Sequence, residues 1–242
     1  MRKILLSGVA LVTLCNANVF AADMPVKAPV RAQLWHWTGC YIGVEGGGTW
    51  GRTHNVDTTA PFVGIPVTGH YDLSGGLFGG TVGCNYQVDR WVLGIENDIS
   101  WTSKKGIANE IPPFNTAATI EVRERWIDTL RGRLGYKFGA QDQFLLYVTG
   151  GGAFAGTRAT TCLPGVFCNS ATNTRSGWTI GGGGEWAIFP SVPVPSNWWS
   201  VKIEYLYVDF GSKNYNFDPT LTTNKSIFLT DHIVRAGLNW HF

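Results

Sequence analysis

Residues 230–242, TDHIVRAGLNWHF, alternate between polar and apolar side chains up to the end of the printed sequence. From Val234 to Phe242 every second residue is apolar, and polar residues such as Arg235 and Asn239 lie between them. Successive side chains of a strand point to opposite faces, so this stretch predicts a strand with one apolar and one polar face. Such a strand suits a wall with lipid on one side and a polar barrel interior on the other.

Residues 1–21 have the features of a secretory signal peptide. Two basic residues precede the apolar run 4–14, which is too short to span a bilayer, and the stretch that ends at Ala21 resembles a cleavage site. We predict cleavage after Ala21, with an uncleaved anchoring helix as the alternative. Residues 22–37 contain two prolines and are predicted to be an extended periplasmic lead-in without a fold of its own.

The composition favours strands. The chain has 31 Gly, 11 Trp, 13 Phe and 8 Tyr among its 242 residues, and only 2 Met. Strand glycines are tolerated in small barrels, where strands curve sharply and interior side chains must fit together. Beyond the signal peptide no apolar run reaches helix-spanning length, so a chain of this sequence in a membrane would cross it as strands.

The charge balance gives no support for nucleic acid as a partner. The chain has 19 basic and 17 acidic residues, and loss of the signal peptide removes Arg2 and Lys3 but no acid, which leaves 17 of each. A mature chain with a formal net charge of zero offers no general attraction for a polyanion.

Eight segments alternate in polarity over roughly ten to fourteen residues, the length that a tilted membrane strand needs. They are residues 39–51, 74–87, 90–103, 120–138, 143–156, 175–188, 197–210 and 229–242. Short turns alternate with four long connections at 52–73, 104–119, 157–174 and 211–228. This pattern predicts an all-β fold for residues 38–242: an eight-stranded antiparallel up-and-down transmembrane β-barrel with four long loops outside the cell.

One face of the predicted strands carries charged residues that would point into the barrel. These are Glu45, Glu96, Asp98, Arg131, Arg133, Glu185, Lys202, Glu204 and Arg235. An eight-stranded barrel has an interior just wide enough for side chains, and charges buried there must be paired. Neighbouring strands would place Glu96 and Asp98 beside the two arginines of the next strand, and Glu204 beside Arg235. We predict a salt-bridged plug that closes the barrel; a narrow ion or solute path lined by the same residues is the alternative.

Four stretches carry a family resemblance: WTGCYIG (37–43), GGTVGCNY (79–86), LRGRLGY (130–136) and LYVTGG (146–151). With the terminal Phe242, they resemble the alphaproteobacterial outer-membrane immunogenic proteins, small porin-like surface antigens with an OmpA-type barrel. The resemblance implies an eight-stranded barrel in a Gram-negative outer membrane, immunogenic in some members and linked to hemin binding in others. It also implies that Phe242 is the signal read by the barrel-assembly machinery.

Four cysteines follow the signal peptide, which suits an oxidising compartment. Cys162 and Cys168 lie in one predicted loop and can close a small ring. Cys40, near the start of the first strand, and Cys84, near the end of the second, come level in an antiparallel hairpin, at positions where the family is expected to carry bulky apolar residues. We predict both disulfides, with free thiols as the alternative. No histidine lies at ligand spacing from these cysteines, so no metal site is predicted.

Candidate catalytic and cofactor residues are sparse. Ser100, Asp98 and His232 can be assembled into a triad only on paper, because no nucleophile motif surrounds the serine, so no enzyme activity is predicted. The glycine runs lack the lysine and helix of a phosphate loop. His54 and His70 lie in the first long loop and are the candidates for hemin iron; no other cofactor is expected.

The sequence therefore predicts a structural, surface-exposed outer-membrane protein that stabilises the envelope and displays four external loops. A narrow porin and a hemin-binding surface protein are the alternatives, and a soluble lipocalin-like barrel is the rival fold. The expected partners are outer-membrane lipid, lipopolysaccharide and, during insertion, the barrel-assembly machinery. Nucleic acid is not an expected partner, and the oligomeric state is left open.

Overall fold

The structure, a computed structural model, describes residues 35–188, 198–218 and 223–242. It separates into residues 1–31 and 32–242, and everything described lies in the second unit. The predicted signal peptide, most of the predicted lead-in and Cys15 lie outside the described residues. Within the described ranges there is no helix with the length and apolarity needed to cross a membrane.

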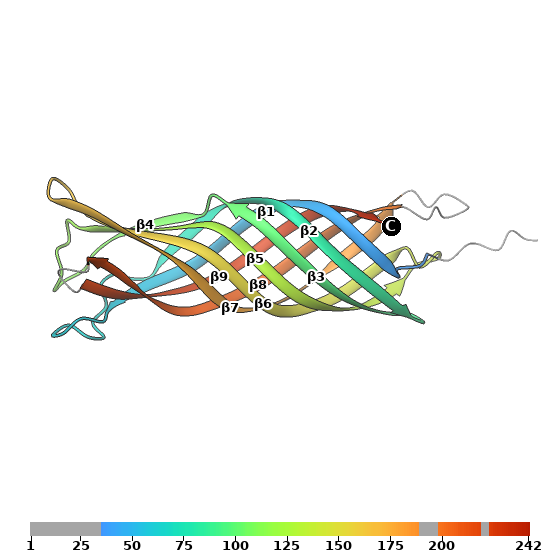
Figure 1. Cartoon of the computed structure of the whole chain (residues 1–242), viewed down its shortest axis with the longest axis horizontal. Coiled ribbons are helices and arrows are strands. Elements are labelled where there is room, and N and C mark those ends of the chain that lie inside the picture. The colour runs from blue at the N-terminus through green and yellow to red at the C-terminus, as the bar shows by residue number, and fades with distance from the viewer. Residues whose placement is uncertain (1–34, 189–197, 219–222) are drawn as a thin grey trace, which may run out of the picture. The chain divides into compact units, whose positions relative to one another are not determined.

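The described strands form one closed antiparallel ring (Figure 1). Their bounds are β1 Gly39–Asp57, β2 Tyr71–Val88, β3 Trp91–Thr102, β4 Lys105–Asn109, β5 Thr119–Phe138, β6 Phe144–Leu163, β7 Phe167–Ile188, β8 Trp198–Asp218 and β9 Thr223–His241. Both β3 and β4 pair with β2 and β5, so they are two parts of one barrel strand that is interrupted at residues 103–104. The pairing of β1 with β9 closes the ring. The predicted all-β up-and-down barrel is thereby confirmed.

The strands extend beyond the predicted segments. Much of the four stretches predicted as long loops is strand, and the connections with described residues shorten to 58–70, 110–118 and 164–166. The prediction of loops there is wrong because buried and exposed residues still alternate in these stretches. The buried residues are polar in β1, as at Thr53 and Asn55, and apolar in β8 and β9, as at Tyr215 and Ile227. Strands of 18 to 22 residues, such as β2 and β7, exceed the length that the membrane requires.

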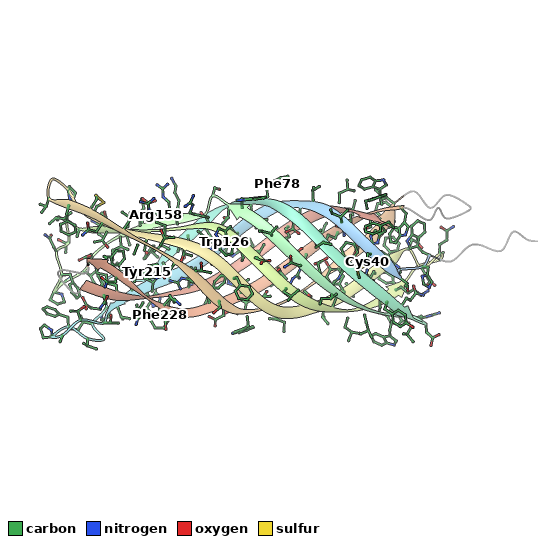
Figure 2. The ribbon with its side chains drawn as sticks, viewed as in Figure 1. Cys40, Phe78, Trp126, Arg158, Tyr215 and Phe228 are labelled. Atoms are coloured by element: carbon green, nitrogen blue, oxygen red, sulfur yellow. A yellow bond between two sulfur atoms is a disulfide. The ribbon has the colours of Figure 1, made fainter. Side chains whose placement is uncertain are left out.

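The outer wall carries an apolar band between two sets of aromatic side chains (Figure 2). The band includes Ile42, Val44, Phe78, Val82, Ile95, Leu134, Val148, Ile180, Ile203 and Leu238, all exposed on the outer face. Trp50, Trp101, Trp126 and Trp178 lie toward the long-loop side, and Trp91, Trp186, Trp199 and Trp240 toward the short-turn side. Such girdles mark the two interfaces of a bilayer. The membrane-spanning segments are therefore 42–50, 78–88, 91–101, 126–138, 144–154, 178–186, 199–207 and 232–242.

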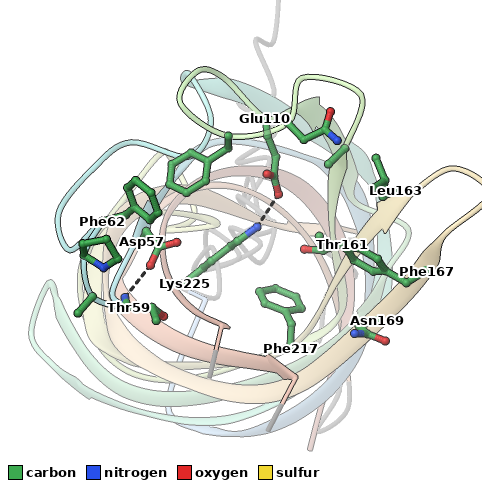
Figure 3. A pocket seen from close by; sticks show the side chains of 15 residues that line it. Asp57, Thr59, Phe62, Glu110, Thr161, Leu163, Phe167, Asn169, Phe217 and Lys225 are labelled. Carbon is green, nitrogen blue, oxygen red and sulfur yellow. Dashed lines mark hydrogen bonds and ion pairs between the residues drawn. The ribbon is translucent and has the colours of Figure 1, made fainter. Parts of the chain in front are cut away.

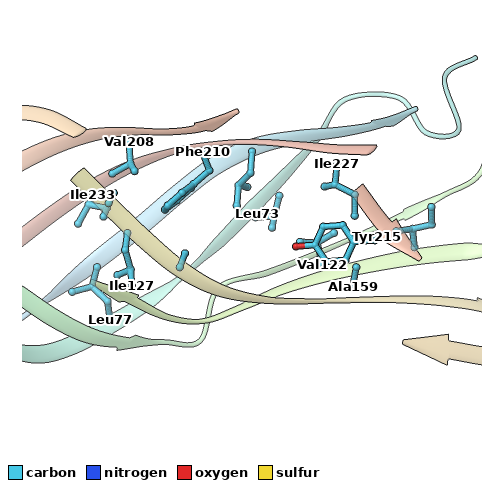
Figure 4. Packing of buried hydrophobic residues seen from close by; sticks show 14 of the residues in the cluster. Leu73, Leu77, Val122, Ile127, Ala159, Val208, Phe210, Tyr215, Ile227 and Ile233 are labelled. Atoms are coloured by element: carbon cyan, nitrogen blue, oxygen red, sulfur yellow. The ribbon is translucent and has the colours of Figure 1, made fainter. Parts of the chain in front are cut away.

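The long-loop half of the barrel has an apolar core that sequence analysis did not foresee (Figure 4). Leu73, Val122, Val208, Phe210 and Ile227 are among its buried members. This half stands above the membrane with water outside, so its strands bury their apolar faces inward as those of a soluble barrel do. The orientation of apolar residues therefore inverts along a single strand.

Tryptophans pack together inside the short-turn end of the barrel. Trp35 and Trp37 are 1% and 0% exposed and pack against Trp198, at ring-centroid distances of 4.8 and 5.1 Å. The backbone of Trp35 donates to the carbonyl of Gln141, and the Trp37 indole donates to the carbonyl of Asp142. The last residues of the predicted lead-in are thus packed into the barrel, because two indoles gain more from burial than from extension into water.

Candidate functional site

The membrane half of the barrel interior holds the nine charged residues singled out above. Each is at most 4% exposed, although their elements, β1, β3, β5, β7, β8 and β9, surround the whole lumen. The strand alternation that turns apolar residues to the lipid turns these residues inward. The structure therefore gathers all nine into one layer, which we call the charge layer.

Arg131 and Arg235 are two centres of this layer. Arg131 contacts Glu96 and Asp98, each at 2.5 Å, and Glu204 at 3.0 Å. Arg235 binds the same Glu204 at 2.6 Å and reaches Asp98 at 2.9 Å and Glu45 at 2.5 Å. The guanidinium fork lets one arginine serve several carboxylates at once, which suits a crowded interior.

Arg133 and Lys202 complete the pairing. Arg133 lies 2.7 Å from Glu185 and 3.2 Å from Glu96. Lys202 lies 3.2 Å from Glu96 and 3.4 Å from both Glu45 and Asp98. The pairs expected between neighbouring strands are present, and contacts such as Arg131–Glu204 also cross the lumen. Every acid of the layer has a basic partner, as buried charges require.

Polar side chains outside the predicted charge network support the layer. Tyr41 donates to Glu96 at 2.6 Å, Tyr147 donates to Glu204 at 3.0 Å, and Ser100 donates to Glu45 at 2.9 Å. Asn239 donates to Glu185 at 2.9 Å, and His241 lies 3.3 Å from the same carboxylate. All five have the inward parity, so the strand alternation of the sequence was the signal that could have found them.

Both predicted cysteine pairs are joined in the structure. Cys40 is bonded to Cys84 at directly paired positions of β1 and β2 (Figure 2). Cys162 is bonded to Cys168 across the β6–β7 hairpin, one pair below the turn at residues 164–166. The second disulfide thus ties two strands rather than a free loop.

The long-loop mouth contains a cavity of about 540 Å³ (Figure 3). Phe62, Phe114, Phe167 and Phe217 line it, together with an ion pair between Lys225 and Glu110 at 2.5 Å. A cavity of this size, largely apolar with few polar groups, is of the kind that binds small molecules. The apolar core of Figure 4 lies in the same half of the barrel as this cavity.

A second buried ion cluster lies above the membrane-spanning segments. Lys104, in the gap between β3 and β4, contacts Glu124 at 3.1 Å and also Asp231, and all three are buried. Burial raises the pKa of Glu124 to about 8; Lys104 acts to lower it, and Asp231 adds to the rise. One lysine therefore serves two carboxylates that share a dry site.

The structure separates the three residues that were considered as a catalytic triad. Ser100 and Asp98 point into the charge layer, whereas His232 lies on the outer wall, where its ring stacks on Trp50 and accepts or donates a hydrogen bond with Tyr205 at 2.7 Å. His54 and His70 do come together, with ring centroids 4.6 Å apart. Among the described residues no group of three or more His, Cys, Asp and Glu could hold a metal ion.

Comparisons with known proteins agree with this architecture. A family model for the outer membrane protein beta-barrel domain matches residues 7–242. The chain is 32% identical over 255 aligned residues to the 31 kDa outer-membrane immunogenic protein of Brucella melitensis biotype 1, with both chains fully covered. It is 28% identical to the 25 kDa outer-membrane immunogenic protein of Brucella abortus biovar 1, over 94% of this chain and 92% of that one.

Among solved structures, the outer membrane protease OmpT from Escherichia coli is similar in fold. The TM-score is 0.51 at 11% identity, over 84% of this chain and 97% of that one. The likeness concerns the fold alone at this identity, and the curated relatives are outer-membrane immunogenic proteins. Neither the relatives nor the described residues give positive evidence of catalysis.

Proposed function

The chain belongs to the outer membrane protein β-barrel domain family, as its motifs predicted, and we propose that it is a closed barrel that stabilises the envelope and displays four external loops. The family and the immunogenic relatives place it in a Gram-negative outer membrane as a surface antigen. The finer role rests on the barrel interior. We propose that the charge layer works as a plug and not as a path for ions.

The observation that carries this proposal is the pairing within the charge layer. Four basic side chains and five acidic ones, each at most 4% exposed, engage one another across the lumen. A conducting pore presents its charges to water, whereas these charges are desolvated and paired with one another. The layer also joins strands that are not sheet neighbours, such as β5 and β8, which braces the wall.

Single-channel recording in planar bilayers tests the plug. The refolded full mature chain is expected to give no stable conductance, and folding is checked by its different gel mobility before and after boiling. A stable single-channel signal that Arg131→Ala abolishes would overturn the plug and establish the narrow porin, the alternative for this barrel.

Hemin binding is a second candidate function, favoured by the proximity of His54 and His70 on the outer side of β1. Burial, together with the neighbouring His70, lowers the pKa of His54, which keeps its ring neutral and able to ligate a metal. Its ring also stacks on Phe228, with centroids 4.4 Å apart. Hemin titration should shift the Soret band in the parent protein and not in the double variant His54→Ala/His70→Ala; no shift in the parent removes this candidate.

We also propose that Phe242 serves as the insertion signal for the barrel-assembly machinery. Its backbone amide donates to the carbonyl of Cys40 at 3.0 Å, which completes the β1–β9 seam, while its side chain is 56% exposed on the outer face. The side chain is therefore accessible while the seam is still open. Phe242→Ala should reduce the amount of assembled barrel in cells without changing the stability of refolded protein by more than about 1 kcal/mol.

A further inference from the structure

Three basic side chains form a row across adjacent strands on the outer wall. Lys105 of β4 pairs directly with Arg123 of β5, and Arg123 pairs directly with Arg158 of β6. All three are exposed on the outer face. A fourth exposed cation, Arg125, follows on β5, and we call these four residues the basic row.

A β-bulge creates this row. The register of β5 against β6 shifts between Glu124 and Trp126, so Arg125 is an extra residue in the strand. Below the bulge, even-numbered residues such as Leu130 face outward; above it, Glu124 is 2% exposed and Arg123 is on the outside. Without the bulge, Arg123 would point into the core and Glu124 outward. Bulges commonly re-aim side chains in this way.

The row lies at the level of lipid headgroups. It begins directly after Trp126, which pairs with Trp101 in the long-loop girdle, and Arg158 lies further toward the long-loop end in Figure 2. The indole of Trp126 lies over Gly156, where a β-carbon would clash with the ring, so this glycine leaves room for the girdle residue. Cations that lie just beyond an aromatic girdle, on the side away from the membrane centre, face the headgroup region of the outer leaflet.

The row is poorly compensated by the protein itself. Arg123 contacts Glu121, and Arg158 donates to the hydroxyl of Ser170 at 2.8 Å. Within the described residues, Lys105, Arg125 and Arg158 have no acidic partner closer than 4 Å. Like charges at directly paired positions of a sheet destabilise it. The chain thus maintains an unfavourable arrangement that an anionic ligand would relieve.

A hollow beside the row has the size and lining for such a ligand. Its volume is about 720 Å³, and Ser74 and Ser103 line it together with all four cations of the row. Arginine forks and serine hydroxyls are the groups that hold phosphate oxygens, since they supply several donors in a fixed geometry. Lys104 and Glu124 at its edge are buried and already paired with each other.

We propose that the basic row is a binding site for the phosphate groups of the outer-leaflet glycolipid, lipid A. The site gives a location for the contact with lipopolysaccharide that the sequence led us to expect, and it is independent of whether the barrel conducts. It fixes one side of the barrel, at β4, β5 and β6, against the headgroups, and it explains why the bulge turns Arg123 outward.

Binding of purified diphosphoryl lipid A to the detergent-solubilised, refolded mature chain tests the proposal. The triple variant Lys105→Gln/Arg123→Gln/Arg158→Gln should bind on the order of a hundredfold more weakly than the parent. The matched control Arg52→Gln/Arg90→Gln/Lys213→Gln removes three exposed cations elsewhere and should bind as the parent does. Folding of every variant is verified by gel mobility before and after boiling.

Two further ligands identify the source of the phosphate. Dephosphorylated lipid A should bind the parent as weakly as diphosphoryl lipid A binds the triple variant, and inorganic phosphate at equal concentration should not compete. Equal binding by the triple variant, or an equal loss in the control variant, overturns the site. Competition by inorganic phosphate at equal concentration overturns the assignment to lipid. Conductance is measured separately, so failure of the plug and failure of this site are distinguishable.

Discussion

Lys104 is a fully buried cation, and its two carboxylate partners, Glu124 and Asp231, lie outside the charge layer. Burial acts to lower its pKa, but Asp231 and Glu124 together raise it above the ordinary value. Burial, and to a smaller extent the neighbouring Asp231, raises the pKa of Glu124 from its ordinary value of 4.5 to about 8, although Lys104 acts to lower it. A carboxyl with a raised pKa in the folded state favours folding at low pH and loses that contribution as the pH rises.

Glu124→Gln should therefore flatten the pH dependence of stability. In the parent, the contribution of Glu124 is complete below about pH 4.5 and is lost as the pH rises through about 8. The amide imitates the protonated carboxyl, so the variant should lose less stability than the parent between pH 5 and pH 9. Stability is measured as the urea midpoint of unfolding at each pH. Glu121→Gln, on the outer wall beside Arg123, is the control and should retain the parental slope. Parallel profiles for the parent and Glu124→Gln would contradict the assignment.

Arg131→Ala should lower the free energy of unfolding by about 3–5 kcal/mol, because it leaves Glu96, Asp98 and Glu204 short of a buried partner. Arg90→Ala, in the exposed turn between β2 and β3, should change it by less than about 0.5 kcal/mol. Urea titrations of both variants in lipid vesicles measure the difference. A similarly small effect of the two substitutions would mean that the ion pairs of the charge layer contribute no net stability.

The alternation of residues indicated which side chains point inward, but not which of them meet. Neighbouring-strand pairs such as Glu204 with Arg235 follow from strand order, because the two residues lie on the inward faces of adjacent strands and are directly paired. The Arg131–Glu204 contact joins β5 and β8, so it depends on barrel diameter and strand stagger, which no local pattern encodes. For the same reason the buried Lys104 cluster could not be foreseen.

At the scale of the strands, sequence reasoning located each crossing but stopped it at the membrane. The continuations of β8 and β9 have apolar residues on the face that is polar within the membrane. Because the polarity pattern reverses along each strand, the sequence was interpreted as a strand followed by a loop. Phe210 and Tyr215, both buried, lie in such a continuation. The bulge at Arg125 gave no signal either, since it changes parity without any unusual composition.

The two disulfides should differ in their contribution to stability. Cys40 and Cys84 are separated by 44 positions, and Cys162 and Cys168 by 6, so the first closes a much longer chain in the unfolded state. Loop-closure entropy gives about 4 kcal/mol for the first pair and about 2 kcal/mol for the second. Double Cys→Ser variants of each pair, compared by urea midpoint under non-reducing conditions, check the order. A larger effect for Cys162→Ser/Cys168→Ser would show that the entropy of the unfolded chain does not govern here.

For the barrel as a whole, three successive layers of different chemistry occupy the interior. Trp35, Trp37 and Trp198 pack at the short-turn end, the charge layer follows inside the membrane, and the apolar core fills the half above it. Each layer satisfies a different requirement: burial of indoles, pairing of charges and exclusion of water from aliphatic side chains. The closure that we propose for the barrel therefore does not depend on the charge layer alone.

Loss of one layer should consequently destabilise the barrel without opening it. Arg131→Ala removes a centre of the charge layer, but buried residues such as Phe210 above it and Trp37 below it stay in place. We expect the refolded variant to remain silent in planar bilayers, although its urea midpoint falls. The variant Trp35→Ala/Trp37→Ala should likewise be silent, since the other two layers persist. Steady conductance from either variant would show that a single layer seals the barrel, and the redundancy inferred from the three layers would then be wrong.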